Sequence, residues 1–173
     1  RVEVLDGKNE IAKAGVLVIQ AQAAYEGGYW NTTGIARYVK TRLIIQEMKK
    51  YKTTVLAHGA TGRGNDQVRF QLAANMLDPQ ITVYAPWRDP AFLRAFGGRK
   101  EMIDFCHLRK IPIKASYRRP YSTDANLLGL THEAGQLESL ETPANFVKSE
   151  MGVLPKDAPD RKERFSVSFE RGW

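Results

Sequence analysis

Residues 58–70 read HGATGRGNDQVRF, and this stretch decides the fold that we expect for the chain. It joins a β-branched, apolar run at residues 53–57 to a helical pattern over residues 66–77, so three glycines lie where a strand turns into a helix. Glycine lets a ligand approach the backbone closely, and the N–H groups and dipole of a helix N-terminus favour anions. The stretch therefore predicts an anion-binding turn. The polar side chains expected to line it are Thr61, Asn65, Asp66 and Arg69.

An ordinary turn is the alternative on these residues alone. The stretch lacks the Gly-Lys-Ser/Thr ending of a Walker A loop and does not match G-x-G-x-x-G, so neither nucleotide-binding motif supports a ligand. Asn65 and Asp66 are also good N-cap residue types, and either could serve only to start the helix. The segments around the turn have to decide between the two interpretations.

Strand and helix patterns alternate on both sides of the turn. Helices are expected at residues 11–25, from Thr32 or Thr33 to about residue 51, at 66–77, and at 89–110 with a break at Gly97-Gly98. Strands are expected at residues 2–5, 53–57, 80–84 and 111–115, and a half-exposed antiparallel strand at 164–171. This alternation predicts an α/β fold with a parallel sheet and helices on both faces. Ligands of such sheets bind beyond the C-terminal strand ends, where residues 58–66 fall.

Composition limits the possible classes of protein. A chain of 173 residues with 43% hydrophobic and 26% charged residues is typical of a globular protein with a core. No apolar run has membrane-spanning length, and the first residues do not resemble a signal peptide. The single cysteine, Cys106, fits a reducing, cytoplasmic compartment and is expected to be a buried structural thiol. No metal site is expected, because His58, His107 and His132 lack cysteine partners at ligand spacing.

The net charge of +7 allows anionic partners of any size. Nucleic acid is the rival partner, because seven basic residues fall within residues 99–119. They are Arg99, Lys100, Arg109, Lys110, Lys114, Arg118 and Arg119. No RNA-recognition, KH, zinc-finger or helix-turn-helix motif accompanies them, so we expect neither a nucleic-acid nor a membrane partner.

Three further blocks of sequence carry a resemblance to a known family. They are YWNTTGIAR at residues 29–37, PWR at 86–88, and YSTDANLLG at 121–129 followed by THEAG at 131–135. Together with residues 58–70, and in the same order, they closely resemble the signature segments of argininosuccinate synthases, and the likeness extends from about Val16 to Trp173. It implies a HUP, Rossmann-like nucleotide-binding domain of the adenine nucleotide alpha hydrolase type, of which residues 1–119 are part. Residues 120–173 would begin an α+β synthetase domain.

The resemblance also implies an activity. Argininosuccinate synthases are cytoplasmic, typically homotetrameric ligases of arginine biosynthesis and the urea cycle. They join citrulline to aspartate, form a citrullyl-adenylate, and release AMP and pyrophosphate from ATP, which is used with Mg²⁺ as a co-substrate. Because the nucleophiles come from the substrates, no catalytic side chain and no metal ligand is expected from the chain itself.

Site residues follow from the resemblance position by position. Aspartate would be held by Thr61, Asn65 and Asp66. Citrulline would be held by Tyr29, Asn65, Arg69, Ser122, Thr131 and Glu133. ATP would contact Gly59, Thr61, Asp66 and Asp124. Arg63 stands where many relatives have lysine, and Gly34 stands where some relatives have a serine that binds citrulline. Arg37 and Arg88 have the alternative of being only surface charges.

One departure from the family bears on activity. The Ser-Gly-Gly-Leu-Asp-Thr-Ser loop that cradles the ATP phosphates in argininosuccinate synthases does not occur in this sequence, and the family extends beyond its last residue. We therefore expect the chain to correspond to the middle of the enzyme and to be inactive alone. The alternative is a non-catalytic amino-acid-binding or scaffold protein derived from the same fold.

Overall fold

The computed structural model describes residues 2–62, 64–113, 121–133 and 135–171. It contains two compact units, Arg1–Thr142 and Pro143–Trp173. The second unit has two short 3-10 turns, η3 (Ala144–Phe146) and η4 (Pro155–Asp157). The predicted strand at residues 164–171 is wrong. Phe165 and Phe169 are exposed there, and the segment pairs with no strand in the described residues. The candidate site residues lie in the first unit.

Helices α1 (Lys8–Gln20) and α2 (Thr32–Lys50) pack against each other near the start of the first unit. Ile11 of α1 is buried with Ala36 and Val39 of α2, and Tyr38 packs on the same cluster. Helix α1 ends at Gln20, five residues before the predicted end, because Gln22 has a positive φ of 48° that a helix cannot continue through. The predicted strand at residues 2–5 is wrong, and this segment is exposed coil.

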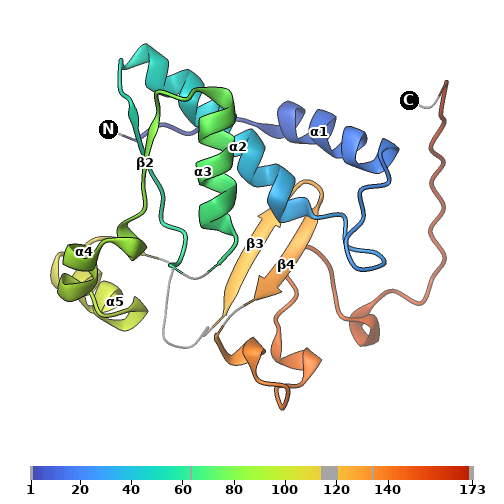
Figure 1. Ribbon diagram of the computed structural model, residues 1–173. Coiled ribbons are helices and arrows are strands. Elements are labelled where there is room, and N and C mark those ends of the chain that lie inside the picture. The colour runs from blue at the N-terminus through green and yellow to red at the C-terminus, as the bar shows by residue number, and fades with distance from the viewer. Residues whose placement is uncertain (1, 63, 114–120, 134, 172–173) are drawn as a thin grey trace. The chain divides into compact units, whose positions relative to one another are not determined.

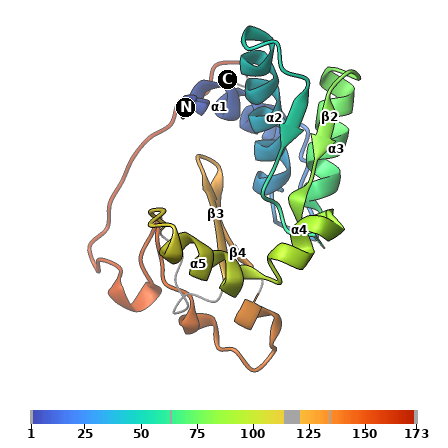
Figure 2. The same ribbon diagram turned by 90° about the vertical axis from the view of Figure 1, so that its left-hand side faces the viewer.

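The centre of the unit is a parallel β-α-β element. Strands β1 (Val55–Ala57) and β2 (Thr82–Tyr84) pair in parallel with Leu56 opposite Val83, and α3 (Asp66–Leu77) connects them. Helices α2 and α3 lie side by side against the pair (Figures 1 and 2). Between helices and strands the core buries five residues, and these are Ile45, Met48, Leu56, Ala74 and Ile81. The predicted α/β class is confirmed.

The opposite face of this strand pair is open. Side chains alternate along a strand, so Leu56 faces the helices while Val55 and Ala57 face away, and both of these are exposed. Tyr84 of β2 is exposed as well. Within the ranges that the structure describes, helices therefore cover one face of the sheet. Among these residues, the helices that we expected on the second face are not found there.

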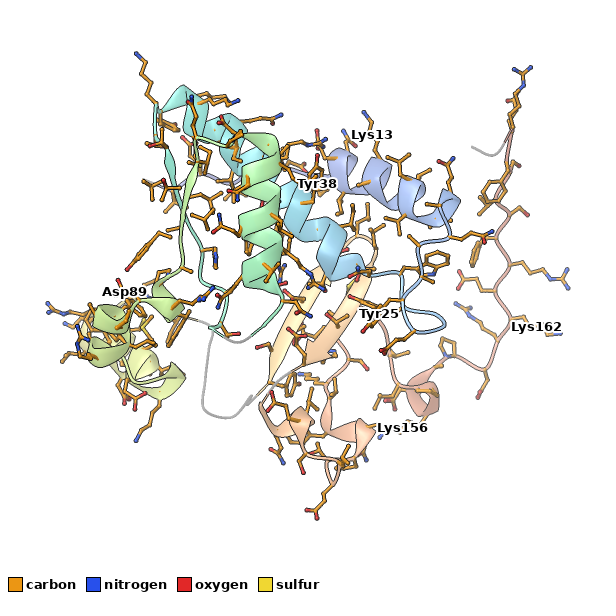
Figure 3. All side chains as sticks on the ribbon, in the orientation of Figure 1. Lys13, Tyr25, Tyr38, Asp89, Lys156 and Lys162 are labelled. Carbon is orange, nitrogen blue, oxygen red and sulfur yellow. The ribbon has the colours of Figure 1, made fainter. Side chains whose placement is uncertain are left out.

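The segment after β2 is helical, as predicted. The 3-10 turn η1 (Pro86–Arg88) leads to α4 (Pro90–Ala95) and α5 (Arg99–Leu108), with Gly97-Gly98 between the two helices. Asp89 caps α4 by accepting a 2.8 Å hydrogen bond from the Ala91 N–H, and it lies at the start of that helix in Figure 3. Residues 111–113 are coil, and the rest of the strand predicted at 111–115 lies outside the described residues, as do Lys114, Arg118 and the expected domain boundary near Arg119.

A β-hairpin follows where the sequence shows no hydrophobic periodicity. Strands β3 (Ser122–Asn126) and β4 (Gly129–Glu133) pair antiparallel, and the 3-10 turn η2 (Gly135–Glu138) comes after them. The hairpin packs on α2, where the Asn126 side chain donates to the Thr32 carbonyl at 3.4 Å, and Leu128 joins the core of α1 and α2. The compact unit continues to Thr142, and the boundary at residue 119 stays a prediction.

Gly62 is a position where we expect a measurable cost of substitution. A Cβ added there would lie 2.6 Å from the Trp87 carbonyl oxygen, so one of the two backbone segments has to move. Gly62→Ala is expected to lower the free energy of unfolding by about 1–3 kcal/mol, the usual cost of forcing an atom into a packed position. Urea unfolding followed by circular dichroism measures it.

Gly28→Ala is the matched control for this substitution. A Cβ at Gly28 would meet no atom within 4 Å, so a change within about 0.5 kcal/mol is expected. Equal urea midpoints for the two variants would contradict the close approach at Gly62.

Candidate functional site

The glycine-rich turn lies at the C-terminal end of β1, as predicted, and leads into α3. Gln67 is buried and its side-chain amide donates to the Thr61 carbonyl, which fixes the turn on the helix. Asn65 occupies the N-cap position, but its side chain makes no capping hydrogen bond and is exposed. A Cβ at Gly59 would meet nothing within 4 Å. The turn therefore exposes its backbone at Gly59 and the polar side chains of Thr61 and Asn65 to solvent. Arg63 lies outside the described residues.

Four charged side chains meet beside this turn. Arg37 of α2 donates from Nε to Asp66 Oδ2 at 2.8 Å, and its Nη2 lies 2.6 Å from the same oxygen. The same Nη2 donates to Asp124 Oδ2 of β3 at 2.8 Å. Arg69, one turn into α3, donates from Nη1 to Asp66 Oδ1 at 2.9 Å. Two helices and one hairpin strand thus contribute to a single network of alternating charge.

The network controls the ionisation of Asp66. Burial alone would raise the pKa of its carboxyl group, but hydrogen bonds from Arg37 and Arg69, together with their positive charges, outweigh burial and hold the pKa below its usual value. Burial likewise opposes the charge of Arg37, whereas the two carboxylates raise its pKa. Both members are therefore ionised at neutral pH, and the site contains a fixed carboxylate at the start of α3.

The hairpin residues implied by the resemblance share one face. Opposite residues of an antiparallel pair point the same way, and Ser122 pairs with Glu133 while Asp124 pairs with Thr131. This face turns toward α2, because Asp124 binds Arg37 and Thr131 lies 3.4 Å from the Thr33 hydroxyl. The fold thus brings together hairpin side chains that the sequence places some ninety residues from α2.

A chain of hydroxyl groups connects the hairpin to the loop before α2. The Tyr29 hydroxyl donates to Thr33 Oγ1 at 3.2 Å, and Thr33 Oγ1 is 3.4 Å from Thr131 Oγ1. Burial would raise the pKa of the Tyr29 phenol, but its hydrogen bonds with Thr32 and Thr33, one of them donated by the Thr33 backbone N–H, and the charge of Arg69 lower it. Arg69 is therefore close enough to act on Tyr29, and the hydroxyl chain borders the charged network.

His58 holds the turn through contacts with Phe70 and Ala60. Its ring stacks on Phe70 with centroids 4.8 Å apart, and its Nδ1 accepts from the Ala60 N–H at 3.3 Å. Burial lowers the pKa of the imidazole, against the opposing charge of Asp66, so His58 is neutral at pH 7. Its role here is to pack and to hold the turn.

Two residues at the centre of the site were not predicted as site residues from the sequence. Arg37, for which a surface charge was the alternative, is buried, and Thr33, considered only as a possible start of the helix, joins Tyr29 to Thr131. Asn31 takes the N-cap position instead, in a left-handed conformation. The signal that could have found Arg37 is a charged residue on the buried stripe of α2, beside Ala36.

A cavity near the turn does not coincide with this site. A cavity of about 160 Å³ lies along the other side of α3, lined by residues of that helix with His58, Val83 and Arg88. The residues implied to hold substrates do not line it. The candidate site is therefore defined by converging polar groups, and Arg88 is exposed rather than part of it.

Three general features of the described residues accompany the site. Within the described ranges, no cluster of three or more histidine, cysteine, aspartate or glutamate side chains is arranged to hold a metal ion. No helix in the described part is both long and apolar enough to cross a bilayer. Cys106 is half-buried rather than fully buried.

Comparison with known proteins agrees with the fold and the motifs. A family model described as the arginosuccinate synthase N-terminal HUP domain matches residues 1–112. A protein of Rhodopirellula baltica named argininosuccinate synthase is 44% identical over 171 residues, which is 98% of this chain and 42% of that protein. Proteins of the same name from Thermotoga maritima and Schizosaccharomyces pombe are 44% and 40% identical, covering 87% and 99% of this chain and 37% and 42% of their own lengths. On the HUP-domain match and these identities, the chain belongs to the argininosuccinate synthase family.

Proposed function

We propose that this chain is the substrate-holding part of an argininosuccinate synthase, a ligase that joins citrulline to aspartate and converts ATP to AMP and pyrophosphate through a citrullyl-adenylate. The observation that carries the proposal is the convergence of Asp66, Arg69, Asp124 and Thr131 on one site in a chain of this family. An enzyme of this kind accelerates the reaction by holding three charged substrates in the position in which they react.

Each amino-acid substrate has suitable groups at the site. The guanidinium of Arg69 donates one N–H to Asp66, and its other N–H groups can bind the citrulline carboxylate. Tyr29, Ser122, Thr131 and Glu133 would complete the polar surroundings of citrulline. The Asp66 carboxylate would accept from the ammonium group of aspartate, and the exposed Thr61 and Asn65 would bind its carboxylates.

ATP would be bound at the glycine-rich turn, with Mg²⁺ carried by its phosphates. The backbone at Gly59 is open, since a Cβ there would meet no atom within 4 Å, and the turn stands at the C-terminal end of β1. Thr61, Asp66 and Asp124 would make further contacts to ATP. These residues supply polar contacts to the nucleotide and leave the phosphate chemistry to groups elsewhere in the enzyme.

The extent of the chain limits what it can do alone. It spans 42% and 37% of the length of the relatives from Rhodopirellula and Thermotoga maritima, and the phosphate-cradling loop of the family is not in its sequence. We therefore expect binding of substrates without turnover, and we place the ligase activity, in a cytoplasmic homotetramer, with the whole enzyme. Steady AMP release by the isolated chain would contradict this expectation.

Calorimetric titration with citrulline, aspartate and ATP in turn tests the proposal. Arg69→Ala is expected to weaken citrulline binding at least about tenfold, because a charge-assisted contact to a carboxylate contributes about 1.5–3 kcal/mol. Arg94→Ala removes an exposed arginine of α4 and serves as control, with citrulline binding unchanged.

Two other outcomes of this titration, and one of a separate titration with nucleic acid, have distinct meanings. Loss of citrulline binding in both arginine variants would point to bulk charge rather than to the site. Binding of the amino acids with no affinity for ATP would favour the non-catalytic amino-acid-binding alternative. Binding of nucleic acid that weakens steeply with salt would favour the basic-surface alternative.

A further inference from the structure

We propose that Arg37 is a positioning residue, which holds the Asp66 and Asp124 carboxylates in the geometry that receives the amino group of aspartate and the nucleotide. This inference rests on the proposed function of the same site. Nothing in the sequence comparison assigns a role to Arg37, and its own contacts carry the argument.

Arg37 is the common partner of two carboxylates from distant parts of the chain. Its Nη2 lies 2.6 Å from Asp66 Oδ2 and 2.8 Å from Asp124 Oδ2. Two carboxylates this close to one point repel each other unless a cation stands between them. The Arg37 guanidinium thus bridges the two carboxylates and fixes the hairpin strand β3 against the start of α3.

The position of Arg37 limits it to an indirect role. Its side chain is 10% exposed, whereas that of Arg69 is 32% exposed, so Arg69 is the arginine that a ligand can reach. Arg37 also lies near the Phe70 ring, with its central carbon 5.9 Å from the ring centroid. A planar guanidinium held on one side by an aromatic ring and on its edge by two carboxylates has little freedom to move.

The arrangement leaves Asp66 one place for a ligand. A carboxylate has about four acceptor positions. Among the described residues, three nitrogen atoms reach Asp66: Nε and Nη2 of Arg37 lie on Oδ2, and Nη1 of Arg69 lies on Oδ1. The remaining position on Oδ1 is the one that would accept the ammonium group of aspartate. Arg37 therefore aims the carboxylate by saturating the oxygen that faces away from the ligand.

Substitution of Arg37 separates positioning from simple structural support. In Arg37→Met the aspartate affinity is expected to fall about 10- to 100-fold, because a misplaced binding group costs this order of magnitude. Citrulline affinity is expected to change less than about threefold, since the hydroxyl chain from Tyr29 to Thr131 does not include Arg37. Arg37→Lys keeps the positive charge but lacks the planar guanidinium that binds two carboxylates at once. We therefore expect its aspartate affinity to lie between those of Arg37→Met and the original chain.

Titration of the Asp66 carboxyl by carbon-13 NMR gives a readout that requires no ligand. Its pKa is expected to rise in Arg37→Met relative to the original chain, and Arg37→Lys should lie between them. The charged or titratable groups that face Asp66 besides Arg37 are Arg69, His58, Lys40 and, from β3, Asp124, and all variants retain them. Lys49→Met, which removes an exposed charge from the same helix, is the control and should change neither readout.

Each outcome decides a separate question. An unchanged Asp66 pKa, unchanged aspartate affinity, or an equal loss of both amino acids in Arg37→Met would overturn the positioning role, the last by showing general structural damage. Failure of the original chain to bind aspartate would instead overturn the proposed function, and the inference about Arg37 with it.

Discussion

Replacing Leu56 by alanine is expected to lower the free energy of unfolding by about 2–5 kcal/mol, the range measured when a buried leucine is truncated in a core that cannot collapse. Leu56 is 2% exposed, and its side chain points from β1 toward the helices α2 and α3. It belongs to a buried cluster that includes Ile45 and Ala74. Removing its side chain leaves a cavity between strand and helices.

The size of the core makes this loss severe. The strand pair contributes few buried residues, because one of its faces is open and carries exposed side chains such as Val55. With a total stability of about 5–15 kcal/mol typical of whole domains, a loss of several kcal/mol removes much of the margin. Urea unfolding should show a lower midpoint or no cooperative transition at all.

Val55→Ala is the matched control for Leu56→Ala. Val55 is the preceding residue on the same strand, faces the opposite way and is 58% exposed. Its truncation is expected to cost less than about 1 kcal/mol, within the range of strand propensity alone. Similar costs at the two positions would show that the helices do not pack on β1 as described.

Helices α2 and α3 could be predicted from the sequence because local signals mark their ends. The predicted helix at residues 66–77 has the bounds of α3, and the second predicted helix matches α2 closely. Within α2 the faces are harder to assign from the sequence: Ile45 is buried, whereas its neighbour Ile44 is exposed. Two adjacent isoleucines on a helix cannot be ranked by periodicity alone.

The hairpin β3–β4 could not be predicted because its buried face is polar. Asp124 and Thr131 point toward α2 and meet Arg37 and Thr33, so the usual alternation of apolar and polar residues is missing. The same pairing explains why Arg37 was not predicted as a site residue. Its partner Asp124 is 87 positions away, and a charged residue on a helix is ordinarily exposed.

The identities of the site residues came from the motifs, whereas their arrangement required the fold. The turn at residues 58–66 was expected at the end of a strand, and it lies there. The sequence did not indicate that the turn, α2 and the hairpin share one charged network. Which substrate each residue holds stays a prediction that the titrations test.

Replacing Asp66 by asparagine is expected to abolish measurable aspartate binding and to lower the free energy of unfolding by about 1–3 kcal/mol at pH 7, the cost of losing hydrogen bonds to charged partners. The amide cannot neutralise the guanidinium groups of Arg37 and Arg69, which bind the carboxylate at 2.6–2.9 Å. Arg69 would then lose the partner that orients it. Calorimetry and urea unfolding measure the two effects.

Asp6→Asn makes the same chemical change at an exposed ion pair. The Asp6 side chain is 70% exposed and lies 3.7 Å from Lys8, so its loss is expected to change stability by less than about 0.5 kcal/mol and leave binding intact. Equal effects of the two substitutions would contradict the network around Asp66.

The stability difference between the original chain and Asp66→Asn should also depend on pH in a specific direction. Because its pKa is lower in the folded chain than in the unfolded chain, the carboxyl contributes its full stabilisation above the unfolded value of about 3.9. As pH falls through the folded value, the folded state takes up the proton and that contribution is lost. The difference in unfolding free energy should therefore be constant from about pH 7 to pH 5 and shrink below about pH 4. A difference that grows on acidification would mean that Asp66 is protonated in the fold, and that Arg37 and Arg69 do not hold it as a carboxylate.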